Sequence, residues 1–147
     1  MIVAICSAKD EADIIGQTIK HLHTQGVQHV YISTPPDDTV TQKAILDAGG
    51  HHQTQEGPFD QGAEITRLAH AVTTFHQPDW IIPFDADEYW IDPLGGTIKT
   101  VLEPLPADCL KVHCAVFKHV DWNYKYTSQN PMGKVCFRPC DEMTVAW

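Results

Sequence analysis

The sequence predicts an α/β domain of three layers, α/β/α, with a mostly parallel central sheet. Short apolar segments, which favour strands, alternate with segments whose apolar residues recur every three or four positions, which favour helices. The alternation gives β-α-β-α-β-α-β within about 85 residues, and connections of this kind produce parallel strands with helices on both faces. A length of 147 residues fits one domain, 1–147.

The first strand and helix follow from local patterns. Residues 2–6 are a short apolar run that reads as a buried strand. Asp10 is a plausible N-cap for the helix that follows, in which Ile15 and Ile19 share one face. Gly26 suits the end of this helix, because glycine adopts the left-handed conformation that often follows a helix.

The later elements are predicted in the same way. Up to the middle of the chain we expect further strands at 27–33, 51–56 and 80–84. A second helix is expected at 40–48, and a third carries Ile65 to His76 and ends before Pro78. Beyond Trp90 we expect a turn at 92–96, a short helix at 97–102, and strands within 109–120 and 134–138.

Composition and charge limit the class of protein. The formal net charge of −9 argues against a nucleic-acid backbone as the main partner. No apolar run approaches the roughly 20 residues of a membrane span. Five cysteines in a chain able to build a core indicate reduced thiols, and with them a cytoplasmic protein. Peripheral attachment to a membrane stays open.

An acidic cluster follows the strand predicted at 80–84. Asp85, Asp87 and Glu88 place three carboxylates within four positions. Side chains two apart in extended chain point the same way, so Asp85 and Asp87 would project together and repel each other. A divalent metal would neutralise them, since carboxylate oxygens suit Mg²⁺ or Mn²⁺. The simpler interpretation is a solvated acidic turn.

Three loops are expected to meet at one edge of the sheet. Ligands of open parallel sheets bind beyond the carboxyl ends of the strands. The acidic cluster lies at such an end, and so do residues 7–11 and 33–38. The pattern therefore predicts one binding site shared by these loops.

With this order of elements, the chain resembles the nucleotide-sugar glycosyltransferases of the GT-A, Rossmann-like fold, and among them the family 2-like group. The segments that carry the resemblance are KDEAD at 9–13, GVQHVYI at 26–32, DDT at 37–39, Gln61 with RLA at 67–69, PFDADEYW at 83–90 and GKVCFRP at 133–139. Together they cover nearly the whole chain.

The resemblance implies an activity and a set of roles. The reaction would transfer a sugar from a nucleoside-diphosphate sugar, with UDP or GDP as the nucleotide, to the hydroxyl of a glycan or other acceptor. Asp87 would bind Mn²⁺ or Mg²⁺, and Asp85 would face the ribose or the metal with its water shell. Glu11 and Asp37 would lie in nucleotide-binding loops, and Arg67 would approach the base or phosphate.

The chain departs from the family pattern at two places. Family members have an acidic residue and Asn after the second strand, where this chain has Thr34 and Pro35. They also continue past a segment like 144–146 to a distal His that completes the metal site. This chain ends at Trp147, which predicts either a truncated piece of a longer enzyme that lacks part of the acceptor site or a reduced relative with little activity.

Other interpretations stay open. The chain could be a non-catalytic binding module, or a nucleotidyltransferase, although segment 7–10 lacks the glycines of a phosphate loop. Glu11 could be an ordinary first-turn acid, and Arg67 could simply pair with Glu64 three positions earlier. The aromatic residues within 121–126 could stack on a sugar or pack within their own loop.

Overall fold

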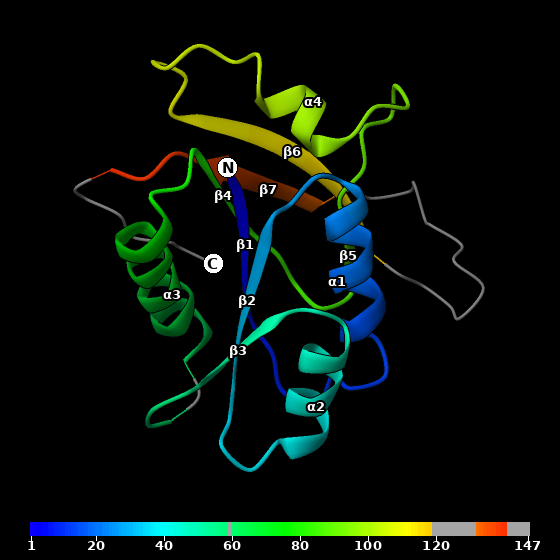
Figure 1. The fold of residues 1–147 in the computed structure, drawn as a ribbon, viewed down its shortest axis with the longest axis vertical. Helices are drawn as coiled ribbons and strands as arrows, with labels where there is room; N and C mark the ends of the chain where they lie inside the picture. The colour runs from blue at the N-terminus through cyan, green and yellow to red at the C-terminus, as the bar shows by residue number, and fades with distance from the viewer. Residues whose placement is uncertain (59, 119–131, 141–147) are drawn as a thin grey trace.

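The computed structural model describes residues 1–58, 60–118 and 132–140, which form a three-layer α/β/α domain (Figure 1). The elements in chain order are β1 (Ile2–Ser7), α1 (Ile15–Thr24), β2 (His29–Thr34), α2 (Thr39–Asp47), β3 (His51–Thr54), α3 (Gln61–His76), β4 (Trp80–Pro83), β5 (Glu88–Tyr89), α4 (Ile98–Leu102), β6 (Lys111–Lys118) and β7 (Met132–Phe137).

The sheet has seven strands in the order β3-β2-β1-β4-β7-β6-β5. β1 pairs in parallel with β2 and β4, and β2 pairs in parallel with β3. β7 is antiparallel to β4 and β6 is antiparallel to β7, so β6 runs in the same direction as the first four strands. The prediction of a mostly parallel sheet is confirmed, because a helix crosses over between each pair of the early strands.

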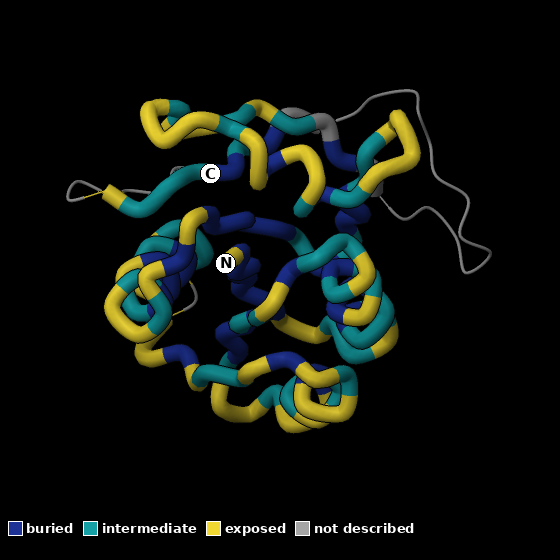
Figure 2. The backbone as a smooth tube through the Cα atoms, turned by 45° about the horizontal axis from the view of Figure 1, so that its top comes forward, coloured by how far each residue is buried: buried dark blue, intermediate teal, exposed yellow. Residues whose placement is uncertain are grey.

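Both faces of the sheet are covered. Helices α1 and α2 lie on one face and α3 on the other (Figure 1). β1 is buried throughout and its side chains alternate: Ile2 and Ala4 join the core under α1 and α2, while Val3 and Ile5 join the core under α3. Figure 2 shows the buried strands enclosed by helices whose outer sides are exposed.

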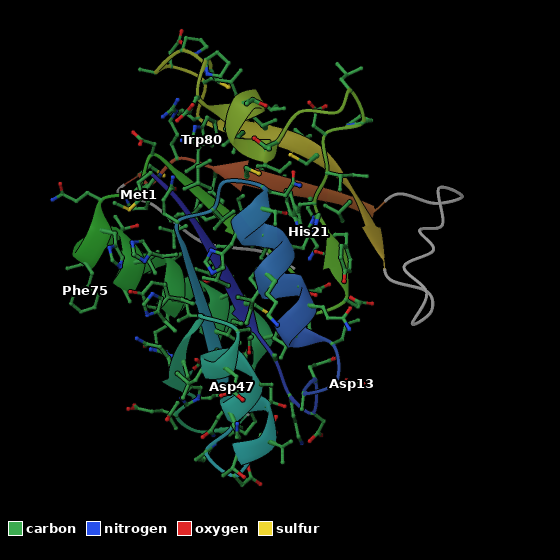
Figure 3. The ribbon with its side chains drawn as sticks, turned by 45° about the vertical axis from the view of Figure 1, so that its right-hand side comes forward. Met1, Asp13, His21, Asp47, Phe75 and Trp80 are labelled. Atoms are coloured by element: carbon green, nitrogen blue, oxygen red, sulfur yellow. The ribbon has the colours of Figure 1, made fainter. Side chains whose placement is uncertain are left out.

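Helix α3 follows the predicted apolar pattern. Ile65, Leu68 and Val72 are buried against the sheet, and Phe75, which is 74% exposed, projects from the outer side (Figure 3). The Asp60 carboxylate caps the helix by accepting from the Ala63 amide at 3.0 Å. The first residue of α3, Gln61, lies at the carboxyl edge of the sheet, close to Ser7 at the end of β1 and to Asp85 after β4.

The C-terminal strands extend the sheet beyond β4. Ile81 of β4 lies opposite Phe137 of β7, and the two strands run in opposite directions. Phe84, three residues after Ile81, therefore lies level with Lys134, three residues before Phe137. This register places a lysine beside the start of the acidic cluster.

The predicted start of α1 is wrong and its predicted end is confirmed. The prediction that Asp10 caps the first helix is wrong: Asp10 has a left-handed φ of 59°, and α1 begins only at Ile15. Gly26 does follow α1 with a φ of 89°, and an added Cβ would lie 2.5 Å from the Cβ of Lys99 on α4. The expectations for 121–126 and 144–146 lie outside the described residues.

Within the described ranges, no helix has the length and apolar character needed to cross a bilayer.

Candidate functional site

The acidic cluster lies where β4 leaves the sheet. The Phe84 amide donates to the Ile5 carbonyl at 3.0 Å, which continues the pairing with β1, and Pro83 has no amide hydrogen to donate. Asp85 and Asp87 are half-buried, while Glu88 is fully buried at the start of β5. The predicted position of the cluster at a strand end is therefore what the structure shows.

Hydrogen bonds hold the cluster in a tight turn. The Glu88 carboxylate accepts from the Asp85 amide, and the Glu88 amide donates to the Asp85 carbonyl, both at 3.0 Å. On the other side, the buried Thr18 hydroxyl of α1 donates to the Ala86 carbonyl. Helix α1 contacts the following residues too, since the centroid of the His21 ring lies 4.8 Å from that of the Tyr89 ring. The backbone of the turn is thus fixed before any ligand binds.

A pocket of about 390 Å³ opens beside this turn. It lies between the loop after β1, the turn after β4 and the first residue of α3. Its lining consists of Ser7, Ala8, Lys9, Glu11, Gln61, Asp85, Ala86 and Asp87. The structure thus brings together three of the residues predicted to bind nucleotide sugar or metal, Glu11, Asp85 and Asp87.

The loop after β1 is held by α2. The Asp10 amide donates to Asp38 Oδ2 at 2.8 Å, and the Glu11 amide donates to Thr41 Oγ1 at 3.1 Å. Asp38 also caps α2 through the Thr41 amide. Burial alone would raise the pKa of Asp38, but these hydrogen bonds outweigh burial and lower it. Sequence reasoning missed Asp38, although an Asp just before a predicted helix is an N-cap signal.

Lys134 supplies a cation to the acidic cluster from within the chain. Its ammonium lies 3.3 Å from Asp85 Oδ2 and 3.5 Å from Glu88 Oε1, and its side chain is only 9% exposed. Gln61 Nε2 donates to the other oxygen of Asp85 at 3.3 Å. Sequence reasoning missed the role of Lys134. The available signal was its position two residues before the apolar Cys136, because side chains two apart in a strand point to the same face and Cys136 is buried in β7.

Cys6 lies in the same electrostatic environment but is not poised for chemistry. It is fully buried at the end of β1. Burial, and after it the charges of Asp85 and Glu88, raise its pKa well above the usual value. The Cys6 thiol is therefore protonated at neutral pH and serves as a packing group.

Arg67 and Asp37 lie apart from the described pocket lining. Arg67 donates from Nε and from a terminal nitrogen to Glu64 Oε2, at 3.1 and 2.8 Å, and a second terminal nitrogen donates to Gln53. Glu64 also accepts from the Ser33 hydroxyl at 2.7 Å. The pair between Arg67 and Glu64, which the sequence left open as an alternative, is therefore present in the structure. Asp37 is exposed in the loop after β2.

The donor atoms in the pocket fit a divalent metal that a phosphate ligand completes. Among the described residues, no three side chains of His, Cys, Asp or Glu form a ready-made metal site. Mg²⁺ is usually held by one or two carboxylates together with phosphate oxygens and water rather than by an all-protein cage. The carboxylates of Asp85 and Asp87 match that pattern.

Comparison with known proteins gives structural neighbours only. No protein-family model matches the chain, and neither does any curated protein. Glucosyl-3-phosphoglycerate synthase from Mycobacterium tuberculosis, in complex with Mn²⁺, UDP and glucosyl-3-phosphoglycerate, aligns with 60% of this chain at 14% identity and a TM-score of 0.50. The aligned part is 34% of the synthase, so this chain spans about a third of that protein.

Two further structures align over more of the chain. HddC from Yersinia pseudotuberculosis covers 93% of it, at 13% identity and a TM-score of 0.51 over 76% of its own length. CMP:2-keto-3-deoxy-manno-octonic acid synthetase, complexed with CTP, covers 93% at 17% identity and a TM-score of 0.50 over 73% of its length. These likenesses show a GT-A-like α/β fold, and the resemblance to family 2 stays a prediction.

Proposed function

We propose that this chain is the donor-binding domain of a metal-dependent glycosyltransferase, which transfers a sugar from a nucleoside-diphosphate sugar to an acceptor hydroxyl. One observation carries the proposal: Glu11, Asp85 and Asp87 line a single pocket at the carboxyl ends of β1 and β4. In open parallel sheets that edge is where nucleotides bind. A pocket of about 390 Å³ has the size of a small-molecule site.

The charges of the pocket suit a metal-bound diphosphate. The carboxylates of Asp85 and Asp87 would hold Mn²⁺ or Mg²⁺, which would offset the negative charge that builds on the leaving diphosphate. Lys9, an exposed residue of the lining, adds a cation for the phosphates. Glu11, which also lines the pocket, would accept hydrogen bonds from the nucleoside. The complex of the structurally similar synthase with Mn²⁺ and UDP supports this arrangement.

Calorimetry of UDP binding with and without Mn²⁺ tests the proposal. We expect UDP to bind in the presence of Mn²⁺ and to lose at least tenfold in affinity when Mn²⁺ is removed. Asp87→Asn should abolish the metal-dependent part, while Asp108→Asn, which changes an exposed acid outside the pocket lining, is the matched control. Equal UDP binding with and without Mn²⁺, or no binding at all, would contradict the proposal. GDP and CDP in the same assay would identify the base.

Nucleotidyl transfer is the second candidate, and one observation favours it. The CTP-bound synthetase covers 93% of this chain, against 60% for the glucosyl synthase. The loop after β1 nevertheless lacks the glycines of a phosphate loop. Incubation with CTP and a sugar acid separates the two functions, because nucleotidyl transfer releases pyrophosphate and glycosyl transfer does not.

A further inference from the structure

Four aromatic rings gather on the α3 face of the sheet, near the amino ends of β2 and β3. They belong to His29, Tyr31, His51 and His76, and we call this group the histidine cluster. His29 and Tyr31 come from β2, His51 opens β3 and His76 ends α3. Tyr31 lies opposite His51 in the strand register, so His29, two residues earlier, is the diagonal neighbour of His51. The cluster therefore lies at the edge of the sheet opposite the acidic pocket.

Ring contacts hold the cluster together. His29 Nδ1 and His51 Nε2 share a hydrogen bond and lie 3.3 Å apart. The His29 ring stacks on the His76 ring, and the His51 ring stacks on the Tyr31 ring, each pair with centroids 4.5 Å apart. A second hydrogen bond, of 2.7 Å, joins the Tyr31 hydroxyl to His76 Nε2. Each of the two facing imidazoles is therefore supported by a stacked ring.

The separation of the two facing nitrogens matches a shared metal ion. Imidazole nitrogens bind Zn²⁺ at about 2.05 Å, so two of them at a tetrahedral angle lie about 3.3 Å apart. His29 Nδ1 and His51 Nε2 already have that separation. The ring that donates the hydrogen can carry it on its other nitrogen instead, because neutral imidazole has two tautomers. Both facing nitrogens then offer a lone pair to the ion.

The chemistry of the cluster differs from that of the acidic pocket. Imidazole nitrogens suit Zn²⁺, Ni²⁺ and Cu²⁺, whereas carboxylates suit Mg²⁺ and Mn²⁺. An ion can reach the pair from solvent, since His51 is exposed and His29 is half-buried. Among the described residues, no third histidine, cysteine or carboxylate completes a metal site with them. Water would fill the remaining positions, so a bound ion would exchange readily.

We propose that the histidine cluster is a second metal site, which binds one exchangeable ion of the Zn²⁺, Ni²⁺ and Cu²⁺ class through His29 Nδ1 and His51 Nε2. Tyr31 and His76 are positioning residues that hold the two ligand rings. The ion links β2 to β3, the strand at the edge of the sheet. It stabilises the fold, because an ion that binds the folded state shifts the folding equilibrium toward it. The site uses no residue of the pocket lining and does not depend on the proposed function.

Titration with Zn²⁺ alone, followed through the ring nitrogen signals of histidine in long-range proton–nitrogen NMR spectra, tests the proposal. We expect the signals of His29 Nδ1 and His51 Nε2 to shift together and to reach saturation at one ion per chain. Zn²⁺ bound through other histidines, or through cysteine sulfur, with both of these nitrogens unchanged would overturn the proposal.

Variants test the same site by affinity. His51→Gln changes an exposed side chain and should weaken Zn²⁺ binding in calorimetry by at least about tenfold, since even residues that only orient a metal ligand change the affinity by that factor. His70→Gln, on the exposed side of α3, is the matched control and should keep the affinity of the wild type. Zn²⁺ should raise the melting temperature of His70→Gln more than that of His51→Gln. Equal Zn²⁺ affinities in the two variants would overturn the proposal.

Discussion

Two buried glutamates at the carboxyl edge of the sheet are neutralised in different ways. Glu64 of α3 meets the guanidinium of Arg67 and the hydroxyl of Ser33. Glu88 meets the ammonium of Lys134, which it shares with Asp85. In the contacts described here, the Arg67 cation serves one carboxylate in the first cluster, whereas the Lys134 cation is shared by two carboxylates in the second.

The difference bears on where an external cation would bind under the proposed function. Arg67 directs two nitrogens at the same Glu64 oxygen, and this fork geometry closes the cluster on itself. The Lys134 ammonium is a point charge between Asp85 and Glu88. Asp87 lines the pocket together with Asp85. We expect external cations at the pocket and not at the Arg67 cluster.

The largest effect on stability is expected from Lys134. Lys134→Met should lower the free energy of unfolding by about 3 kcal/mol, because it removes a cation that lies 3.5 Å from the fully buried Glu88. Lys134→Arg should lower it by less, since the charge remains. Urea unfolding followed by circular dichroism measures both. A loss below about 1 kcal/mol for Lys134→Met would mean that Asp85 and Glu88 do not depend on the ammonium.

Arg67 should matter less, because its side chain is 40% exposed. Arg67→Met should lower the free energy of unfolding by about 1 kcal/mol, since water screens the pair and Ser33 still donates to Glu64. Calorimetry should show that the affinity for UDP with Mn²⁺ changes less than threefold. A tenfold loss of that affinity would instead place Arg67 in contact with the nucleotide, as the resemblance to family 2 implies.

Asp38 connects α2 to the pocket loop. Asp38→Ala removes the N-cap of α2 and the acceptor of the Asp10 amide, so we expect a loss of about 1 kcal/mol in unfolding free energy. The affinity for UDP with Mn²⁺ should also fall, by about threefold, because Glu11 is then held less firmly. Asp47→Asn, at the exposed end of the same helix, is the control. Equal UDP affinity in both variants would show that the loop does not need this support.

A histidine cluster far from the pocket gives the smallest effect. Burial and the neighbouring His76 lower the pKa of both His29 and His51 from 6.5. A lowered pKa means that the folded state favours the neutral ring, so stability is full above about pH 6.5 and falls as the pH decreases below it. His51→Gln should flatten the fall in melting temperature between about pH 7 and 5, and His70→Gln, on the exposed side of α3, should not. Equal slopes in the two variants would contradict the assignment.

Much of the fold could be predicted because it depends on local patterns. Apolar runs and helical periodicity indicated the early strands and helices, and the parallel arrangement followed from their alternation. The end of β4 was predictable for the same reason, so Asp85 and Asp87 were found at a strand end. The start of α1 was not, because Asp10 bonds to Asp38, 28 residues away.

The charge balance of the site could not be predicted, since it depends on pairs far apart in sequence. Two carboxylates two residues apart indicate a cation but not its source. The source, Lys134, reaches Asp85 only because β7 pairs with β4 in an antiparallel register. Gln61 was part of the resemblance, but its contact with Asp85, 24 residues away, was not predicted for the same reason. Arg67 was placed near the nucleotide by resemblance, whereas the local spacing to Glu64 described its actual contact.

Broadening of backbone NMR signals by Mn²⁺ in the presence of UDP tests the central claim most directly, because it shows where the ion binds. We predict that the amide signals of residues 85–88 and 7–11 disappear at the lowest Mn²⁺ concentrations, while those of His51 and His76 persist longest. Broadening centred on the histidine cluster or on the Arg67 cluster, or no selective broadening, would contradict a metal-dependent nucleotide site at the acidic pocket.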